Sequence, residues 1–224
     1  VDEKNKLIVE QDVTNAVTDV DQLSKISKQA KEKLGVEEIK VVADMGYYNG
    51  KEIKACEADG IEPYVAKPLT SANRKLGLYG KEKFKYDSRK DCYLCPGGQE
   101  LTYRFDTHEK ERHIRYYATS ACRSCKIKSK CTRDKTGRRI TRWVDEHILE
   151  RMQERVEKNR ELMKKRKLIV EHPFGTIKHW NDQGCFLMRS LEKVRAKMSL
   201  SALAYNIKRA INILGTQRII EALL

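Results

Sequence analysis

Apolar residues recur along the chain with two different periods, and the changes of period predict helices and strands. From residue 18 to 34 they recur every three or four positions, as on one face of a helix. Thr18 and Asp21 have the spacing of a capping box at its start. A second helix is predicted to begin after Asn49, which suits an N-cap, and to run through Cys56.

Short runs of β-branched and aromatic residues separate these helices. Residues 39–43 and 64–66 predict two buried strands, and residues 1–9 predict a hairpin whose first strand is cut. An alternation of strands and helices is typical of an α/β sheet, which places functional residues at the carboxyl ends of its strands. Asp44 follows such a strand. It is a candidate catalytic residue, although an aspartate there is often only a turn former.

Helical periodicity is absent from about residue 67 to 142 and returns from Asp145. The resumed helix leads to Glu171, and Pro173 is expected to kink or restart it there. Seven residues are nearly two helical turns, so Glu171 and Lys178 would share one face, as suits a metal-binding carboxylate and a phosphate-holding cation. The alternative is an ordinary surface pair on a kinked helix.

Four segments are therefore expected. They are an N-terminally truncated core, a basic Cys-rich insertion, a helical C-terminal part of the core and a tail, at residues 1–67, 68–142, 143–215 and 216–224. Within the third segment, a last helix from about 190 to 214 is expected to be capped by Ser190 and to serve packing.

The charge balance favours a nucleic-acid partner. The chain has 46 Lys and Arg against 32 Asp and Glu, a net charge of +14, and a pI near 9.4. A solvated lysine surface is the plain alternative. No apolar run approaches the length of a membrane span and no signal-peptide pattern opens the chain, so the expected location is the cytoplasm, with no membrane partner.

Cysteine spacing is the strongest chemical signal that the residues give by themselves. Cys92 and Cys95 form one Cys-x2-Cys pair and Cys122 and Cys125 another, which predicts a tetrahedral Zn²⁺ site. The intervening 26 residues exceed the usual spacing. Other possible ligands are Cys131, His108 and His113. Four reduced thiols without metal are the alternative. Cys56 and Cys185 are expected to be small core residues.

Three stretches carry a family resemblance: residues 41–48 (VVADMGYY), 170–178 (VEHPFGTIK) and 191–195 (LEKVR). Together they resemble the DDE transposases of bacterial insertion sequences, in a branch with a cysteine-bearing insertion. The resemblance extends from Val1 to Arg209. It implies an RNase H-like fold, as in ribonuclease H and retroviral integrases, with a mixed sheet, flanking helices and a zinc-ribbon-like insertion.

The resemblance also implies a site in which two Asp and one Glu hold Mg²⁺ or Mn²⁺. Asp44 matches the second acid and Glu171 the third, 127 positions later, while Lys178 matches a basic residue of the family signature. The segment that carries the first acid is not found, and the chain is expected to begin downstream of it. Asp2 and Asp12 are conceivable substitutes.

The basic residues before Glu171 depart from the family pattern. Lys164 and Lys167 stand where relatives carry Tyr and Arg, and lysine lacks the bidentate fork of arginine. DNA-backbone contacts are expected from Lys178 and from the basic run, which consists of Lys164, Lys165, Arg166 and Lys167.

The predicted function is therefore DNA transposition and recombination, by metal-dependent cleavage and strand transfer on double-stranded transposon ends and target DNA. The chain alone is expected to be inactive, and the full protein to act as a homo-oligomer on DNA near the bacterial nucleoid. Two alternatives remain. One is a non-catalytic zinc-ribbon DNA-binding protein, such as the remnant of a broken transposase gene. The other is a nuclease of the same fold without strand transfer.

Overall fold

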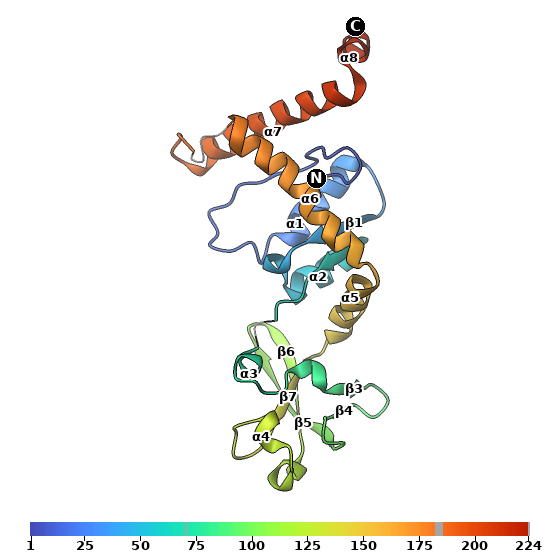
Figure 1. The fold of residues 1–224 in the computed structure, drawn as a ribbon, viewed down its shortest axis with the longest axis vertical. Coiled ribbons are helices and arrows are strands. Elements are labelled where there is room, and N and C mark those ends of the chain that lie inside the picture. Colours follow the sequence, from blue (N-terminus) through green and yellow to red (C-terminus); the bar gives the residue numbers. More distant parts are fainter. Residues whose placement is uncertain (70, 182–185, 224) are drawn as a thin grey trace. The chain divides into compact units, whose positions relative to one another are not determined.

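The computed structural model describes residues 1–69, 71–181 and 186–223 (Figure 1). Contacts between Cα atoms divide the chain into two compact units. Unit 1 comprises Val1–Lys67 and Arg151–Leu224, and unit 2 comprises Pro68–Glu150. Unit 1 is an α/β unit and unit 2 is mostly β, and each has its own core. No helix among the described residues is long and apolar enough to cross a membrane.

Unit 1 is built on two parallel strands, β1 (Ile39–Ala43) and β2 (Ile61–Val65), paired from Ile39↔Ile61 to Ala43↔Val65. Parallel strands need a crossover, and here α2 (Gly50–Ala58) supplies it after a short 3₁₀ turn, η1 (Met45–Tyr47). Helix α1 (Leu23–Leu34) packs on α2 and on both strands.

The core of unit 1 lies between these helices and the strand pair. Most of its fully buried side chains are apolar, with Ser27 of α1 as a polar exception. The apolar ones include Leu23, Ile53, Cys56, Ile61, Val65 and Met152, from α1, α2, β2 and α5. Burial also raises the pKa of the Cys56 thiol to about 12, so this cysteine is a core residue, as predicted.

The C-terminal half of unit 1 is helical. The resumed helix is two helices, α5 (Glu146–Lys158) and α6 (Arg160–Thr176), because Asn159 leaves the helical region with φ −120° and ψ 43°. A π-helical turn, η4 (Ile177–Asn181), follows α6 directly. Helix α7 (Leu191–Leu214) ends before Gly215, as predicted, and α8 (Thr216–Leu223) makes the expected tail a helix.

Unit 2 is a five-stranded antiparallel meander in the order β3-β4-β5-β6-β7. The strands are β3 (Lys85–Asp87), β4 (Cys92–Leu94), β5 (Glu100–Glu109), β6 (Arg112–Ala118) and β7 (Arg139–Trp143). Residues 101–105 and 114–118, whose alternation of side chains is typical of ribbon strands, lie within β5 and β6. Short helical segments connect or flank them: α3 (Ala72–Lys75), η2 (Lys81–Lys83), η3 (Ser120–Ser124) and α4 (Lys128–Cys131).

A compact aromatic cluster forms the core of unit 2. Its buried members come from both ends of the unit: Phe84, Tyr93, Leu101, Tyr117, Cys131 and Ile140. The Tyr93 and Tyr117 rings meet edge to face with centroids 5.2 Å apart.

The described strands form a parallel pair in unit 1 and a separate antiparallel sheet in unit 2. Three local predictions are corrected by the structure. Residues 1–9 contain no strand, although the predicted turn forms and is closed by the Asp2 N–H donating to the Leu7 carbonyl at 2.9 Å. The Asp2 carboxylate also accepts the N–H groups of Asn5 and Leu7. Ser190 makes no side-chain cap. Helix α6 does not restart near Glu171 but continues through Pro173, whose ring is fully buried.

The first helix begins later than the capping box at Thr18 predicts. Asp21 is engaged elsewhere, because its carboxylate accepts a hydrogen bond from Asn49 Nδ2 at 2.7 Å. Glu52 of α2 takes over the capping role by accepting from the backbone N–H and the hydroxyl of Ser24. The start of α1 therefore depends on a partner 28 residues away. The predicted core role of Cys185 lies outside the described residues.

Candidate functional site

Asp44 lies at the carboxyl end of β1, where the sequence places it. Its backbone is extended, and its Oδ1 accepts the N–H of Gly46 at 2.9 Å, so the carboxylate caps the 3₁₀ turn η1. The other oxygen, Oδ2, lies 3.6 Å from an Arg166 guanidinium nitrogen. With 47% of its side chain exposed, Asp44 keeps access to solvent and to a ligand.

Helix α6 brings Glu171 toward the same strand. Arg166 anchors α6 beside the end of β1, and Glu171 follows five residues later, roughly 7.5 Å further along the helix axis. The Glu171 side chain is 61% exposed, and its nearest cation is Lys167 one turn earlier, at 3.7 Å. The two candidate acids therefore lie on packed elements of one unit, each beside a basic side chain of α6.

Lys178 lies just beyond the α-helix of Glu171. The α-helix ends at Thr176, and Lys178 belongs to the π-helical turn η4, which has a wider hydrogen-bonding period. The shared face predicted for the two side chains assumed α-helical geometry over all seven residues, and it stays a prediction. Lys178 itself is exposed and follows the helix that carries Glu171.

The basic run on α6 is paired with acids throughout. Lys164 and Lys165 lie 2.8 and 3.6 Å from Glu161 and Glu3. Arg166 and Lys167 face the two candidate catalytic acids. Arg166 is the most buried of the four, with 25% of its side chain exposed. It therefore positions Asp44 more than it offers charge to solvent.

Asp2 and Asp12, the two conceivable substitutes for the first acid, already make hydrogen bonds or ion pairs within unit 1. Both Asp2 oxygens hold backbone N–H groups at 2.7 Å. Asp12 pairs with Lys25 at 2.6 Å and with Arg195 at 3.0 Å. The hydrogen bond from Lys25 is the main reason that the pKa of Asp12 lies below its ordinary value.

No three His, Cys, Asp or Glu side chains within the described ranges are already arranged to hold a metal ion. Asp44 and Glu171 nevertheless offer the right chemistry, since hard carboxylate oxygens are the ligands that Mg²⁺ prefers. Both are accessible, and their ion-pair partners in the structure are the cations Arg166 and Lys167. They fit as two ligands of an incomplete site.

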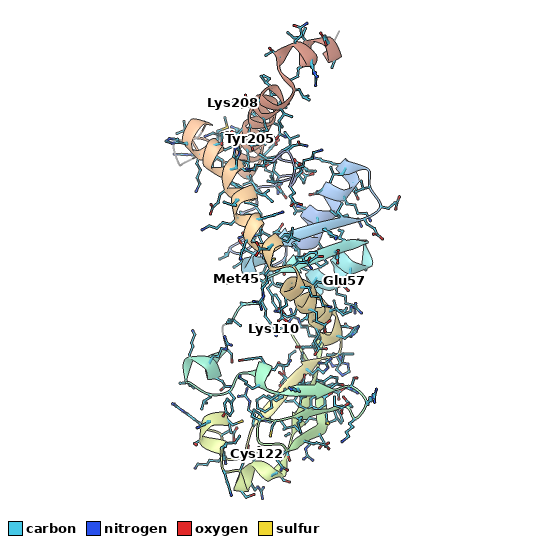
Figure 2. The ribbon with its side chains drawn as sticks, turned by 45° about the vertical axis from the view of Figure 1, so that its right-hand side comes forward. Met45, Glu57, Lys110, Cys122, Tyr205 and Lys208 are labelled. Atoms are coloured by element: carbon cyan, nitrogen blue, oxygen red, sulfur yellow. The ribbon has the colours of Figure 1, made fainter. Side chains whose placement is uncertain are left out.

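Three of the four cysteines predicted to bind zinc meet in unit 2. Cys95, Cys122 and Cys125 line a small cavity together with Cys131, whereas Cys92 does not line it. All five are free thiols. The other suggested ligands, His108 and His113, stack on each other across β5 and β6, and neither lines the cavity. In Figure 2, Cys122 marks this end of the unit.

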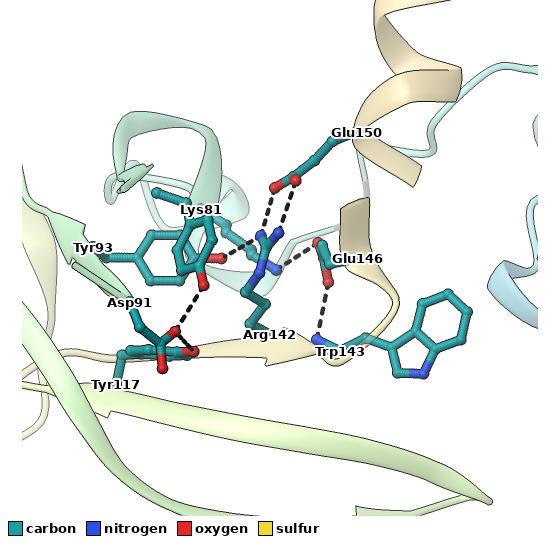
Figure 3. A network of polar contacts seen from close by, with 9 residues as sticks. Lys81, Asp91, Tyr93, Tyr117, Arg142, Trp143, Glu146 and Glu150 are labelled. Atoms are coloured by element: carbon teal, nitrogen blue, oxygen red, sulfur yellow. Dashed lines mark hydrogen bonds and ion pairs between the residues drawn. The ribbon is translucent and has the colours of Figure 1, made fainter. Parts of the chain in front are cut away.

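A polar network missed by the sequence reasoning joins the strands of unit 2 to the start of α5 (Figure 3). Arg142 donates to Glu150 through two nitrogens, at 2.5 and 2.8 Å, and to the Tyr93 hydroxyl at 3.3 Å. Asp91 accepts from the hydroxyls of Tyr86 and Tyr117, both at 2.7 Å. Arg142 occupies an inward position of the β7 alternation, which is the only signal that could have indicated its burial.

Comparison with known proteins assigns the chain to a family. The family model described as a transposase DDE domain matches residues 94–211, just over half of the chain. The match includes Glu171 and Lys178, whereas Asp44 lies upstream of it. No curated protein and no solved structure matches the chain. Such domains generally use divalent metal ions and act on DNA. Since the model covers more than half of its residues, the chain belongs to the transposase DDE domain family.

Proposed function

We propose that this chain belongs to an insertion-sequence transposase with an RNase H-like catalytic core. Unit 1 would be that core and unit 2 an insertion between β2 and the C-terminal helices. The observation that carries the proposal is the Asp44–Arg166 pair, which joins the carboxyl end of β1 to the helix of Glu171. The substrate would be double-stranded DNA in the bacterial cytoplasm, at transposon ends and target sites.

Asp44 and Glu171 would hold Mg²⁺ or Mn²⁺ together with a third acid. When bound, such ions polarise the phosphate and activate the attacking water or 3′-hydroxyl. Arg166 would keep the Asp44 carboxylate oriented. Lys178 and the exposed lysines of the basic run would contact DNA phosphates without reading sequence. Two transposon ends must be processed together, which favours a homo-oligomer on DNA.

We also propose that unit 2 holds a Zn²⁺ ion through cysteine thiolates. Paired Cys-x2-Cys spacing and five free thiols in one small unit support this. A non-catalytic zinc-bearing DNA-binding protein is the second candidate function. It is favoured by the charge of unit 2, where 20 Lys and Arg face 11 Asp and Glu.

Cleavage of transposon-end DNA by the full-length gene product tests the catalytic proposal. Asp44→Asn and Glu171→Gln should each reduce Mg²⁺-dependent cleavage by at least about 100-fold, because each removes a charged metal ligand. DNA affinity and the circular-dichroism spectrum should stay unchanged. Glu161→Gln, another exposed glutamate of α6, is the matched control and should cut normally.

Near wild-type cleavage by Glu171→Gln would overturn the assignment of the third acid. If the wild-type gene product bound DNA but neither cut nor joined it, the non-catalytic alternative would stand. Cleavage without joining of the cut end to target DNA would instead indicate a nuclease.

A further inference from the structure

The cavity among the cysteines of unit 2 has the size and lining of a single-ion site. Its volume is about 20 Å³, room for little more than one water-sized sphere. Four thiols line it from three segments: Cys95 after β4, Cys122 and Cys125 around η3, and Cys131 at the end of α4. Three segments that are separated in sequence thus place their thiol groups around one small cavity.

Two glycines let the backbone approach these thiols closely. A Cβ on Gly97 would lie 3.6 Å from Cys95 Sγ and 3.7 Å from Cys125 Sγ, so this glycine sits between the two sulfurs. A Cβ on Gly137, which has a φ of +119°, would lie 2.6 Å from the Cβ of Cys122. Only glycine therefore fits at position 137, where the backbone lies against Cys122.

Two polar groups beside the cavity could stabilise sulfur once it is bound to a metal. Gln99 N–H donates to Cys95 Sγ at 3.4 Å, in a tight turn closed by a Gly98 N–H to Cys95 carbonyl bond of 2.9 Å. Such N–H groups stabilise a sulfur anion. Arg138 also lines the cavity, and its buried Nε has no hydrogen-bond partner among the described residues. A metal-bound thiolate would offer this Nε an acceptor.

Cys92 is kept from this cavity by strand geometry. It pairs with Asp87 and Thr102 in β4, and successive side chains of a strand point to opposite faces. Tyr93 points into the aromatic core that Cys95 and Cys131 also contact. Cys92, one position earlier, is buried on the other side, with 3% of its surface exposed.

We propose that Cys95, Cys122, Cys125 and Cys131 bind one Zn²⁺ ion, and that Cys92 is not a ligand. The four ligands would form a tetrahedral site with Zn–S bonds of about 2.3 Å. The thiols are not yet at coordinating distances, so binding requires their side chains to rotate into the cavity. This inference rests on the proposed zinc ion of unit 2 and is independent of the chemistry at Asp44 and Glu171.

The site would also fix the most basic segment of the molecule. Residues 123–139 contain eight Lys or Arg and a single acid, Asp134. Two of the four thiols, Cys125 and Cys131, lie within that segment and Cys122 directly precedes it. Metal binding would therefore order a strongly cationic loop that has little core of its own.

The test compares serine variants of the full chain, purified after expression with zinc. Elemental analysis should find about one zinc per wild-type chain and below about 0.2 in Cys95→Ser, Cys122→Ser, Cys125→Ser and Cys131→Ser. Cys92→Ser, the matched control, should keep about one. Replacement by Co²⁺ should give the absorption of a tetrathiolate centre in the wild type and in Cys92→Ser alike.

Alkylation of the wild-type chain covers the case in which a variant fails to fold. Added Zn²⁺ should protect the four proposed ligands from a maleimide and leave the labelling of Cys92 unchanged. Zinc-dependent protection of Cys92 in place of Cys131 would overturn the ligand set. Absence of zinc binding would overturn the site as a whole, while DNA cleavage by the full-length protein would still decide the catalytic proposal separately.

Discussion

Arg142 and Glu150 form an ion pair whose two members are unequally exposed. Only 7% of the Arg142 side chain is exposed, against 47% of the Glu150 side chain. The guanidinium also lies over the Tyr86 ring, 3.7 Å from its centroid. Water can therefore hydrate the Glu150 carboxylate when Arg142 is removed, but it cannot reach the Arg142 guanidinium when Glu150 is removed.

This inequality predicts which substitution destabilises the protein more. Glu150→Gln leaves a buried charge without its counter-ion and should lower the free energy of unfolding by about 2 kcal/mol. Arg142→Met fills the space with an apolar chain and leaves a hydrated carboxylate, so it should cost at most about 1 kcal/mol. Urea unfolding followed by circular dichroism measures both, with Glu154→Gln on the same helix as control. The opposite ranking would show that the pair is not desolvated as described.

Asp91 provides a pH-dependent contribution to stability. Burial alone would raise its pKa, but the hydrogen bonds from Tyr117 and Tyr86 outweigh this and lower it from 3.8. A lowered folded pKa gives stability that is present above pH ~4 and is lost as the pH falls through the folded pKa. Asp91→Asn should therefore cost about 1 kcal/mol at pH 7, and the difference should shrink below pH ~4. A difference that is constant with pH would contradict this account.

At the scale of single residues, the sequence located Asp44 at the end of its strand but misjudged which cysteines meet. The reason is geometric. A Cys-x2-Cys pair converges only when both residues lie in a turn, and Cys92 lies in a strand that sends it to the opposite face from Tyr93. Cys131 joins the others through an α4 helix of four residues, which is too short to leave a periodic pattern.

At the scale of elements, hydrophobic period predicted β1, α2, α7 and the ribbon strands well. Helix ends were predicted less well, because their partners are distant in sequence. Glu52 caps α1 from another helix, and Asn159 interrupts an otherwise continuous amphipathic pattern. Pro173 is tolerated inside α6, where its ring is buried.

Side chains of helix α7 hydrogen-bond to the backbone of residues 5–8, as a neighbouring strand would do with its own backbone. Asn206 accepts from the Ile8 N–H at 2.9 Å and donates to the Ile8 carbonyl at 2.8 Å. The Tyr205 hydroxyl donates to the Lys6 carbonyl at 2.8 Å, and Arg209 donates to the Asn5 carbonyl at 2.7 Å. Tyr205 is labelled on α7 in Figure 2. The segment thus depends on side chains for its backbone hydrogen bonds.

A graded pair of variants tests this attachment. Asn206→Leu removes both bonds to Ile8 and should cost about 2 kcal/mol, while Asn206→Asp keeps the acceptor and should cost less. Hydrogen exchange of the Ile8 amide should be fastest in Asn206→Leu, intermediate in Asn206→Asp and slowest in the wild type. Equal exchange in all three proteins would show that Asn206 does not hold the segment.

At the scale of the whole molecule, the excess positive charge is unevenly distributed. Unit 2 carries a net charge of +9 in 83 residues, leaving +5 for the rest of the chain. Each cation of the basic run on α6 lies within 4.0 Å of a carboxylate. In contrast, Lys126, Lys130, Arg133 and Lys135 are exposed in a segment with one acid.

The salt dependence of DNA binding should reflect this distribution. Changing Lys126, Lys130, Arg133 and Lys135 to Gln should reduce the slope of log affinity against log salt by about 2 to 4, since each phosphate contact contributes about 0.9. Changing Lys164, Lys165, Arg166 and Lys167 to Gln should reduce it by less than about half as much. Fluorescence anisotropy with a duplex of arbitrary sequence measures both slopes. An equal or larger effect of the second set would place the main DNA contact on α6.

The surroundings of Trp143 give unit 2 an optical signal of its own. The indole is one of two in the chain and is 7% exposed, with the Arg112 guanidinium 5.7 Å from its ring centroid. Its backbone N–H donates to Glu146 in the network of Figure 3. A shielded indole emits at shorter wavelength than a hydrated one, so opening of this network shifts the emission to the red.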